Sequence, residues 1–439
     1  MILDPDVETA PWPEQAAQDE PLYRRQIAWL FERSRFYRDK LRRAGFASSD
    51  AVGGLDRIAR LPLTAKDELR AGRSAAEPIG THLCVPMDEV VRVFSTSGTT
   101  GTPSYIPLTR PDLDAWVRTS ARSYAASGLG RGQRIVSTYN AGPFVAGAAL
   151  AAFDALGLCH VPVGTGHTER LLAAIRDLEV QILALTPSYA LHLAERAEER
   201  GLDLPGSSVA RLMVAGEPGG GEPGMRARLE RAWGARVTEV MGIGDISVSL
   251  WGECEAQGGM HFSGRGFVHV ELIDPESGAP LPIVDGAEGE LVLTHLRQQA
   301  APLLRFRSRD HVTVRTGACP CGRTAPRIRC IGRTDDMLIV RGVNLFPSAV
   351  REVVGRFAPT ISGVISIRPQ APGVRQEPPL PVTVELAPGE AAGEALAERI
   401  RHEIRAVLAV TARVDLVPWG TLPRSEYKSK LVERPEGAA

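Results

Sequence analysis

Short apolar runs alternate with longer helix-like segments through the middle of this chain. The runs CHVPV, ILALT and RLMVAG are separated by TERLLAAIRDL and SYALHLAERAEERG, whose apolar residues recur at helical spacing. This alternation is typical of an α/β domain in which helices cover a largely parallel sheet. Glycine-rich turns follow the runs, at the strand ends where such sheets bind ligands. We therefore expect functional residues in those turns.

The sequence changes character twice towards its C-terminus. From Phe267 it is rich in strand-like runs such as FVHVELID and GELVLTHL, which predict a β subdomain. Near Asp336 a further unit begins, with strand-like and helix-like runs that predict a small α+β domain. A chain of 439 residues exceeds what one hydrophobic core usually supports. We expect one domain over residues 1–334 and a second over residues 335–439.

Charge and hydropathy exclude several classes of partner. The chain has 51 Lys and Arg against 52 Asp and Glu, a net charge of −1, so it lacks the basic field that attracts nucleic acid or anionic membranes. It has no run of about 18 apolar residues, and its first residues are acidic, unlike a signal peptide. We expect a cytoplasmic protein without nucleic-acid or membrane partners.

The N-terminal region gives weaker signals. Residues 1–20 are proline-rich and acidic, and we expect them to cover the surface loosely. Apolar residues at helical spacing predict one amphipathic helix from Leu22 to Leu41. Thr64 and Asp67 stand three residues apart, which predicts a reciprocal helix cap.

The segment FSTSGTTGTPSYIPLT raises the question of phosphate binding. It has neither the spacing nor the lysine of a Walker loop. Its two glycines still expose backbone N–H groups, and its Ser and Thr residues add hydroxyl donors, as a loop around ATP phosphates requires. A solvated turn is the alternative interpretation. The candidate phosphate ligands are Ser95, Thr96, Ser97, Gly98, Thr99, Thr100 and Gly101.

The cysteines form a second constellation. Cys254 and His261 are seven residues apart, and Cys319 and Cys321 form a C-x-C pair. In a reducing compartment such residues are more often metal ligands than disulfide partners. The two pairs suit a closed tetrahedral Zn²⁺ site with a structural role, in which Cys330 is a possible replacement ligand. Buried free thiols are the alternative.

A set of ordered motifs resembles the adenylate-forming superfamily, and in particular its phenylacetate–CoA ligase-like branch. The resemblance extends over nearly the whole chain after residue 20. It implies a large adenylate-forming domain with mostly parallel sheets and a β subdomain, followed by a small mobile α+β domain. The motifs are STSGTTGTP, TGHTERLL, TPSYAL, AGEP, MGIGD, LLRFRSRD, CPCGRTAPRI, IGRTDDMLIVRGVNLFPS and LPRSEYKSK.

The resemblance assigns roles to individual residues. Lys428 would bridge the acid carboxylate and the α-phosphate of ATP as a point charge. Asp310 would accept hydrogen bonds from the ribose, with Arg333 nearby, and Asp245 would help to hold Mg²⁺. The small domain would rotate about a hinge at Asp336. The adenine would lie against Gly216, Glu217 and Pro218.

The acid pocket departs from the family pattern in part. Met241 stands where an aromatic residue is usual, Gly244 where a hydroxyl residue is usual, and Thr102 where a positive or polar residue is usual. A polar Asn140 beside two aromatic residues would suit a substituted aryl acid, because a buried amide needs a partner; core packing of the aromatic residues is the alternative. The candidate pocket residues are Tyr139, Asn140, Gly142, Phe144, Met241 and Gly242.

Three functions remain open at this point. The resemblance implies an acid–CoA ligase that uses ATP and coenzyme A, with a homodimer as the expected assembly. An adenylating enzyme in a specialised biosynthetic pathway, with a carrier-protein thiol, an amine or another acceptor, or with a non-carboxylate substrate, would share these motifs. A nucleotide-binding regulator without catalysis is the third, and the presence of Lys428, Asp310 and Asp245 argues against it.

Overall fold

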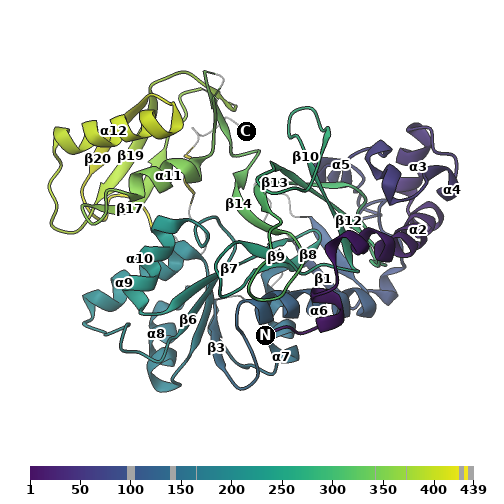
Figure 1. The fold of residues 1–439 in the computed structure, drawn as a ribbon, viewed down its shortest axis with the longest axis horizontal. Helices are drawn as coiled ribbons and strands as arrows, with labels where there is room; N and C mark the ends of the chain where they lie inside the picture. Colours follow the sequence, from purple (N-terminus) through teal and green to yellow (C-terminus); the bar gives the residue numbers. More distant parts are fainter. Residues whose placement is uncertain are drawn as a thin grey trace. The chain divides into compact units, whose positions relative to one another are not determined.

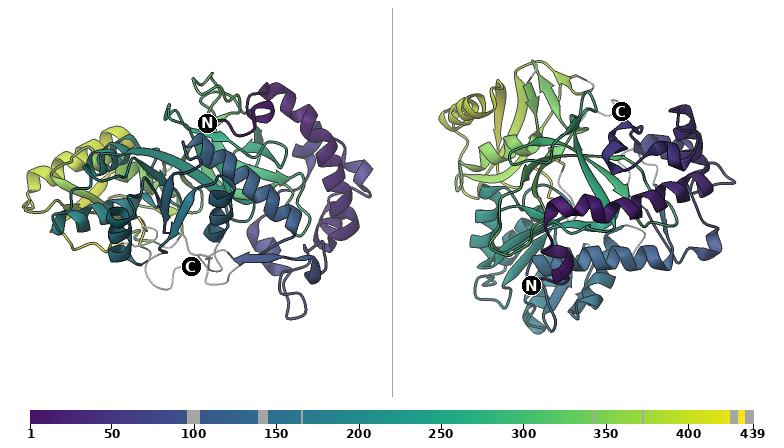
Figure 2. Two further views of the ribbon diagram at one scale, coloured as in Figure 1. Left: turned by 90° about the horizontal axis from the view of Figure 1, so that it is seen from below. Right: turned by 45° about the vertical axis from the view of Figure 1, so that its right-hand side comes forward.

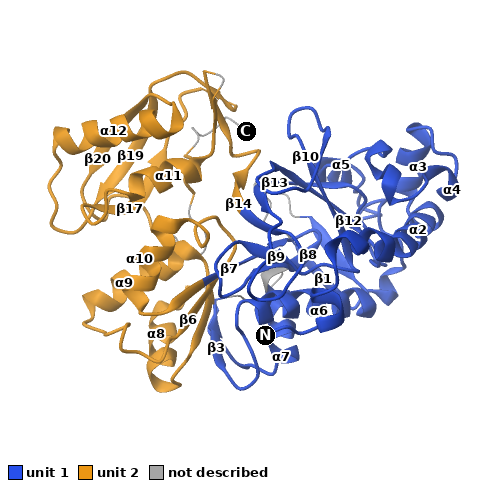
Figure 3. Cartoon of the chain, in the orientation of Figure 1, with its two compact units in different colours: residues 1–164, 238–329 blue, residues 165–237, 330–439 orange. Residues whose placement is uncertain are grey.

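The structure of the protein is a computed structural model of mixed α/β architecture (Figure 1). It describes residues 1–95, 104–138, 145–164, 166–341, 343–371, 373–424 and 430–433. The chain divides into two compact units (Figure 3). Residues 1–164 and 238–329 form the first, and residues 165–237 and 330–439 form the second. No helix within the described ranges is long and apolar enough to cross a membrane.

The first unit begins with helices packed on an apolar cluster that includes Leu30, Leu41 and Leu304 (Figure 2, purple). The predicted helix over 22–41 is in fact two helices, because Ser34 ends one and caps the next through a hydrogen bond from the Tyr37 N–H. The elements are α1 (Pro5–Glu8), η1 (Trp12–Glu14), α2 (Gln15–Arg33), α3 (Arg35–Arg43), α4 (Ser49–Val52), η2 (Leu55–Arg60), α5 (Lys66–Ala71) and η3 (Met87–Glu89).

Two expectations for this region are wrong. Residues 1–20 do not lie loosely on the surface, since the buried Glu8 side chain accepts a hydrogen bond from Arg323 and Gln15 accepts one from Arg265. These partners are 315 and 250 residues away, so local composition does not indicate them. Thr64 does not cap α5, because its hydroxyl donates to the Leu304 carbonyl. Glu68 instead accepts from the Ala65 N–H at the start of α5.

Helices and short strands continue the first unit. The helix α6 approaches β8 closely at Gly252, where a Cβ would lie 2.3 Å from the Ser123 carbonyl oxygen, so no larger residue fits. The strands β1 and β2 pair antiparallel, and β3 and β4 pair parallel. The elements are β1 (Arg92–Ser95), β2 (Tyr105–Leu108), α6 (Arg110–Ala126), β3 (Arg134–Ser137), η4 (Val145–Ala148), α7 (Ala149–Ala155) and β4 (Cys159–Pro162).

The predicted β subdomain is a run of antiparallel strands. β7, β8 and β9 pair in succession, and β9 also pairs with the start of β14. β10 pairs with both β11 and β12, and β12 pairs with β13. The strands are β7 (Arg236–Ile243), β8 (Ser247–Glu253), β9 (Met260–Phe262), β10 (Val268–Ile273), β11 (Pro280–Leu281), β12 (Glu288–His295), β13 (Phe306–Arg315) and β14 (Arg327–Arg333).

The second unit joins helices and parallel strands from the middle of the chain to the C-terminal α+β region. β5 and β6 pair parallel, as the alternating pattern predicts. The C-terminal helix α12 buries Ile400 and Ile404 against a sheet in which β19 lies between β17 and β20 (Figure 1). The elements are α8 (Thr168–Asp177), β5 (Ile182–Leu185), α9 (Pro187–Glu199), β6 (Arg211–Val214), α10 (Pro223–Trp233), β15 (Leu338–Val340), β16 (Val343–Leu345), α11 (Pro347–Gly355), β17 (Ile361–Ile367), β18 (Arg375–Gln376), β19 (Leu380–Leu386), α12 (Glu394–Leu408) and β20 (Ala412–Val417).

Candidate functional site

The predicted phosphate-binding segment lies between the paired strands β1 and β2. Ser95 is the last residue of β1, is buried, and is opposite Tyr105 of β2 in the antiparallel register. The other predicted phosphate ligands, Thr96 through Gly101, lie outside the described residues. The same is true of the predicted pocket residues Tyr139, Asn140, Gly142 and Phe144, and of Lys428.

Asp245 occupies the turn between β7 and β8. The turn closes through a hydrogen bond from the Ile246 N–H to the Ile243 carbonyl. Gly242 is required here, because a Cβ at this position would lie 1.9 Å from the Val248 carbonyl oxygen. Met241, the other pocket candidate of this segment, is paired with Trp251 across the two strands. The hairpin thus holds the Asp245 carboxylate at its tip.

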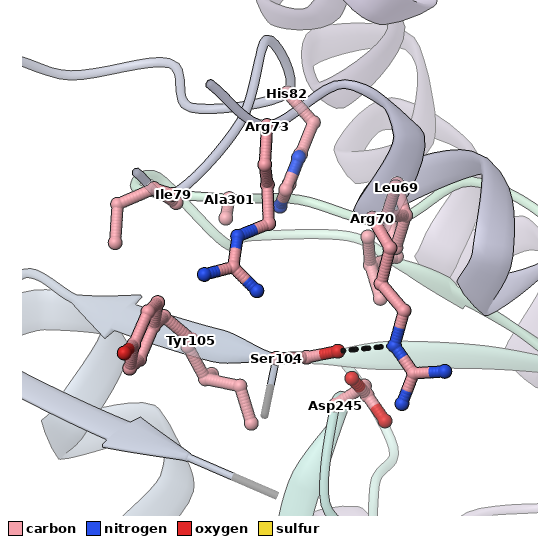
Figure 4. Close-up of a pocket in the computed structure, with 11 residues that line it drawn as sticks. Leu69, Arg70, Arg73, Ile79, His82, Ser104, Tyr105, Asp245 and Ala301 are labelled. Atoms are coloured by element: carbon pink, nitrogen blue, oxygen red, sulfur yellow. Dashed lines mark hydrogen bonds between the residues drawn. The ribbon is translucent and has the colours of Figure 1, made fainter. Parts of the chain in front are cut away.

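A lysine that sequence reasoning missed faces this carboxylate. Lys66 of α5 lies with its Nζ 2.7 Å from an Asp245 Oδ, and the Asp245 side chain is 12% exposed. Arg70 follows Lys66 by four residues on the same face of α5, and Arg73 follows Arg70 by three residues in the loop after the helix ends at Ala71 (Figure 4). That spacing in LPLTAKDELRAGR was the available signal. The pair also bears on Mg²⁺, since a cation bound by Asp245 would share its carboxylate with Lys66.

The buried side chain of His295 forms hydrogen bonds that hold the same turn in place. Its Nδ1 accepts a hydrogen bond from the Leu303 N–H at 2.9 Å, so Nε2 carries the proton and donates to the Ile246 carbonyl at 3.1 Å. Burial lowers the pKa of His295 to about 4, which keeps the ring neutral near pH 7. The neutral ring therefore supports the backbone next to Asp245.

Asp310 lies at an irregularity in β13. Glu290 is opposite His311, and Val292 is opposite Arg307, so three residues of β13 face the single residue between Glu290 and Val292. Arg309 has a φ of 66° at this bulge. Bulges redirect side chains and are common beside active sites. The Ser308 hydroxyl accepts a hydrogen bond from the Asp310 N–H at 3.0 Å.

The two arginines of LLRFRSRD that precede this bulge have structural partners. Arg307 makes a bidentate ion pair with the fully buried Glu290 carboxylate, at 2.9 and 2.7 Å. Arg305 pairs with Glu271 and donates to the carbonyls of Ala59 and Leu61. These contacts anchor the strand that carries Asp310.

The predicted adenine segment has its own contacts within the second unit. Gly216 has a φ of 94°, which favours glycine. The Glu217 carboxylate accepts a hydrogen bond from the Ser188 N–H at the start of α9. The Pro218 carbonyl accepts a 2.6 Å hydrogen bond from Arg351 of α11, whose guanidinium also pairs with Glu222 at 2.8 Å. The segment is therefore joined directly to the C-terminal region.

The predicted ribose and hinge residues lie in a turn after β14. Arg333 pairs with Asp335 at 2.8 Å, and both side chains are about half exposed. The Asp336 N–H donates to the Arg333 carbonyl, which closes the turn before β15. Arg333 is thus directed to a neighbouring carboxylate in this structure.

The structure brings the four predicted zinc ligands together. The ligand atoms of Cys254, His261, Cys319 and Cys321 all lie within 4.8 Å of one another. Cys254 Sγ is 3.5 Å from Cys319 Sγ, and Cys321 Sγ is 3.4 Å from His261 Nε2. Hydrogen bonding from Cys254 and His261 lowers the pKa of the Cys321 thiol. Tetrahedral Zn–S bonds of about 2.3 Å place ligand atoms roughly 3.8 Å apart, so this donor set fits Zn²⁺.

The fold and these motifs define an AMP-binding enzyme of the adenylate-forming class. The family model for AMP-binding enzymes matches residues 46–296, and the model for the AMP-binding enzyme C-terminal domain matches residues 342–433. The chain belongs to this family.

Several relatives that match over nearly the whole chain are phenylacetate-coenzyme A ligases. Phenylacetate-coenzyme A ligase of Thermus thermophilus is 35% identical over 97% of both chains, and that of Escherichia coli is 32% identical over 97% of this chain and 96% of the other. The crystal structure of 2-hydroxyisobutyryl-CoA ligase in the postadenylation state, with R3-HIB-AMP, is similar with a TM-score of 0.90. It is 28% identical and covers 98% of this chain and 92% of its own.

Proposed function

We propose that this protein is an ATP-dependent, AMP-forming acid–CoA ligase. The observation that carries the proposal is the 35% identity with a phenylacetate-coenzyme A ligase across 97% of both chains. Relatives of that name from three further bacteria match at 32–34% identity. In the first half-reaction a carboxylate attacks the α-phosphate of ATP and pyrophosphate leaves. In the second, the thiol of coenzyme A displaces AMP.

The residues of this chain divide the adenylation step among them. Lys428 holds the carboxylate and α-phosphate oxygens together and offsets the charge that develops on phosphorus. Asp310, presented by the anchored bulge of β13, accepts from the ribose hydroxyls. Asp245 offers a hard oxygen ligand for Mg²⁺, which supplies charge neutralisation at the phosphates when bound. The His295 ring orients the turn that carries this carboxylate.

The second half-reaction requires another arrangement of the C-terminal domain. We place the boundary between domains at residues 334 and 335 and the hinge at Asp336. Solved structures of 2-hydroxyisobutyryl-CoA ligase include a postadenylation state and a thioesterification state with CoA, which supports two states for an enzyme of this kind. Arg351 contacts Pro218 and Glu222 within the second compact unit.

The acid is proposed to be an arylacetic or related aryl acid, as the phenylacetate-coenzyme A ligases suggest. A panel should contain phenylacetate, substituted aryl acids and 2-hydroxyisobutyrate, with pyrophosphate release measured with and without coenzyme A. We expect sustained release only with an aryl acid and coenzyme A together. Lys428→Ala should reduce it at least about a hundredfold, in the range found for removal of a transition-state charge partner, and Lys430→Ala serves as the matched control because Lys430 is exposed.

Three results would contradict parts of this proposal. Sustained release without coenzyme A would indicate another acceptor, such as an amine or a carrier-protein thiol. Preference for 2-hydroxyisobutyrate would overturn the aryl assignment. ATP binding without release from any acid would favour a non-catalytic regulator.

We also propose a structural Zn²⁺ at Cys254, His261, Cys319 and Cys321. Four protein ligands leave no open coordination position, so the ion stabilises the β region and takes no part in catalysis. Elemental analysis of the purified protein should give about one zinc per chain. Cys319→Ser with Cys321→Ser should lose the zinc and lower the melting temperature, whereas Cys159→Ser, at an exposed cysteine outside the cluster, should change neither. Full zinc retention by the double variant would contradict the assignment.

The expected cellular setting and assembly complete the proposal. The six cysteines form no disulfide in the structure, and we propose the cytoplasm as the compartment because metal-ligand cysteines are typical of a reducing environment. A homodimer is proposed from the family resemblance, and light scattering of the purified protein gives its mass directly.

A further inference from the structure

An arginine of the predicted lysine motif is held by two carboxylates from different parts of the second unit (Figure 3). Arg424 belongs to LPRSEYKSK and precedes Lys428 by four residues. Its Nε donates to Glu195 of α9 at 3.1 Å, and its Nη1 and Nη2 donate to Glu385 of β19 at 3.1 and 2.6 Å. Glu195 precedes the proposed domain boundary and Glu385 follows it. Arg424 therefore joins the two proposed domains.

The pair with Glu385 keeps Arg424 attached to the C-terminal α+β region. The Glu385 side chain is fully buried, and its carboxylate also accepts a 2.8 Å hydrogen bond from the Leu422 N–H. The Trp419 ring lies under the guanidinium, with its centroid 4.5 Å away. A bidentate arginine–carboxylate pair is strong and geometrically specific. These contacts give Arg424 a fixed place relative to β19.

The contact with Glu195 can be released at low cost, because each member keeps a partner on its own side of the boundary. When the hydrogen bond from Nε breaks, Arg424 still has Glu385. Glu195 still has Arg228 of α10, whose Nη2 lies 3.8 Å from the other carboxylate oxygen. Breaking a buried ion pair is costly when it leaves a charge uncompensated, and here neither charge is left so. Such a contact suits a domain that docks and undocks.

The helix α9 places this contact near the predicted adenine segment. The Ser188 N–H in its first turn donates to Glu217, and Glu195 follows Ser188 by seven residues, roughly 10 Å along a helix. The four residues from Arg424 to Lys428 extend over at most about 14 Å. The length of the chain thus allows Lys428 to reach a nucleotide at the adenine segment while Arg424 is bound to Glu195.

We infer that Glu195 and Arg424 are positioning residues for the adenylation step. The inference rests on the proposed function. Their contact docks the start of the lysine segment on α9 while the acid carboxylate attacks the α-phosphate. Its release accompanies the rotation of the C-terminal domain before coenzyme A reacts. Both residues act through the place that they give to Lys428.

Two assays that each report one half-reaction test the inference, with the acid that the panel above selects. Acid-dependent exchange of labelled pyrophosphate into ATP reports adenylation, and thioester formation from the synthetic acyl-adenylate and coenzyme A reports the second step. Glu195→Gln keeps the Arg424–Glu385 pair, so the fold is retained. It should lower the pyrophosphate exchange rate about tenfold or more, as for a lost hydrogen bond to a charged group, and leave the thioester step within about twofold.

Two further variants serve as matched comparisons. Glu195→Asp keeps the charge on a shorter side chain and should recover part of the pyrophosphate exchange rate. Glu199→Gln makes the same chemical change one helical turn further along α9, at a side chain that is 52% exposed, and should match the unaltered protein in both assays. An exchange rate that Glu195→Gln leaves unchanged would overturn the inference. Equal losses in both half-reactions, or a loss in the thioester step alone, would also overturn it.

Amide hydrogen exchange supplies a readout that needs no turnover. The amides of residues 418–433 should exchange faster in Glu195→Gln than in the unaltered protein or in Glu199→Gln, because the segment has lost its contact with α9. Faster exchange of this segment in a protein that activates no acid would support the positioning contact while rejecting the ligase. Exchange that rises equally throughout the chain would show a general loss of stability and overturn the inference.

Discussion

At the scale of residues, several side chains act by holding a neighbour in place. His295 binds the turn next to Asp245, and Arg307 binds Glu290 beside the bulge that presents Asp310. Glycines 242 and 252 are required by close backbone approach. Sequence motifs identify the residues that meet a ligand more readily than those that position them, because a supporting contact depends on a partner that is distant in the chain.

The histidine supplies a prediction about pH. The pKa of His295 is lowered to about 4 in the folded chain and is about 6.5 when unfolded. Between pH 4 and pH 6.5 the His295 ring binds a proton in the unfolded chain but not in the folded one. The stability that the neutral ring contributes is therefore complete above pH 6.5 and is lost as the pH falls towards 4. The free energy of unfolding should fall more steeply on acidification than in His295→Gln, by up to about 1.4 kcal/mol per pH unit.

Denaturant unfolding of both proteins at pH 7.5, 6 and 5 measures this difference. Other titrating groups, including Asp19 with its raised pKa, are common to both proteins and cancel in the comparison. Parallel pH dependences for the two proteins would show that the His295 ring takes up its proton as readily when folded as when unfolded.

At the scale of elements, α11 is tied to the loop before α10 by one buried ion pair. Arg351 and Glu222 are 2.8 Å apart, with side chains 6% and 11% exposed. Arg351→Gln leaves a buried carboxylate without its partner, which should cost about 3 kcal/mol of unfolding free energy. Adding Glu222→Gln should restore part of that loss, since no uncompensated charge then remains.

A double-mutant cycle in urea measures the coupling. The control is Arg356→Gln, which breaks an exposed pair with Glu403 and should change stability by less than about 1 kcal/mol. Additive losses in the cycle would mean that Arg351 stabilises the loop only through the Pro218 carbonyl. Because the loop contains the proposed adenine segment, the KM for ATP should be followed in the same variants.

At the scale of the whole molecule, the sequence predicts the α/β class, the C-terminal α+β region and the clustering of Cys254, His261, Cys319 and Cys321. These predictions succeed because hydrophobic periodicity and the spacing of metal-binding residue types can be seen in short stretches of sequence. The predictions of a loose segment over residues 1–20 and of a helix cap at Thr64 were wrong, since the contacts of both depend on partners hundreds of residues away. The ion pair between Lys66 of α5 and Asp245 was not predicted, because its two members are 179 residues apart.

The anchored N-terminal residues have a practical consequence for anyone who handles the protein. Glu8 holds Arg323, which lies two residues from Cys321, and the carbonyl of Met1 accepts a hydrogen bond from the same arginine. An affinity tag fused directly before Met1 therefore adds its bulk beside the cysteine loop. A tag at the other end follows Lys428 by only eleven residues. Purification is best planned with a long, cleavable N-terminal linker, removed before metal content or activity is assayed.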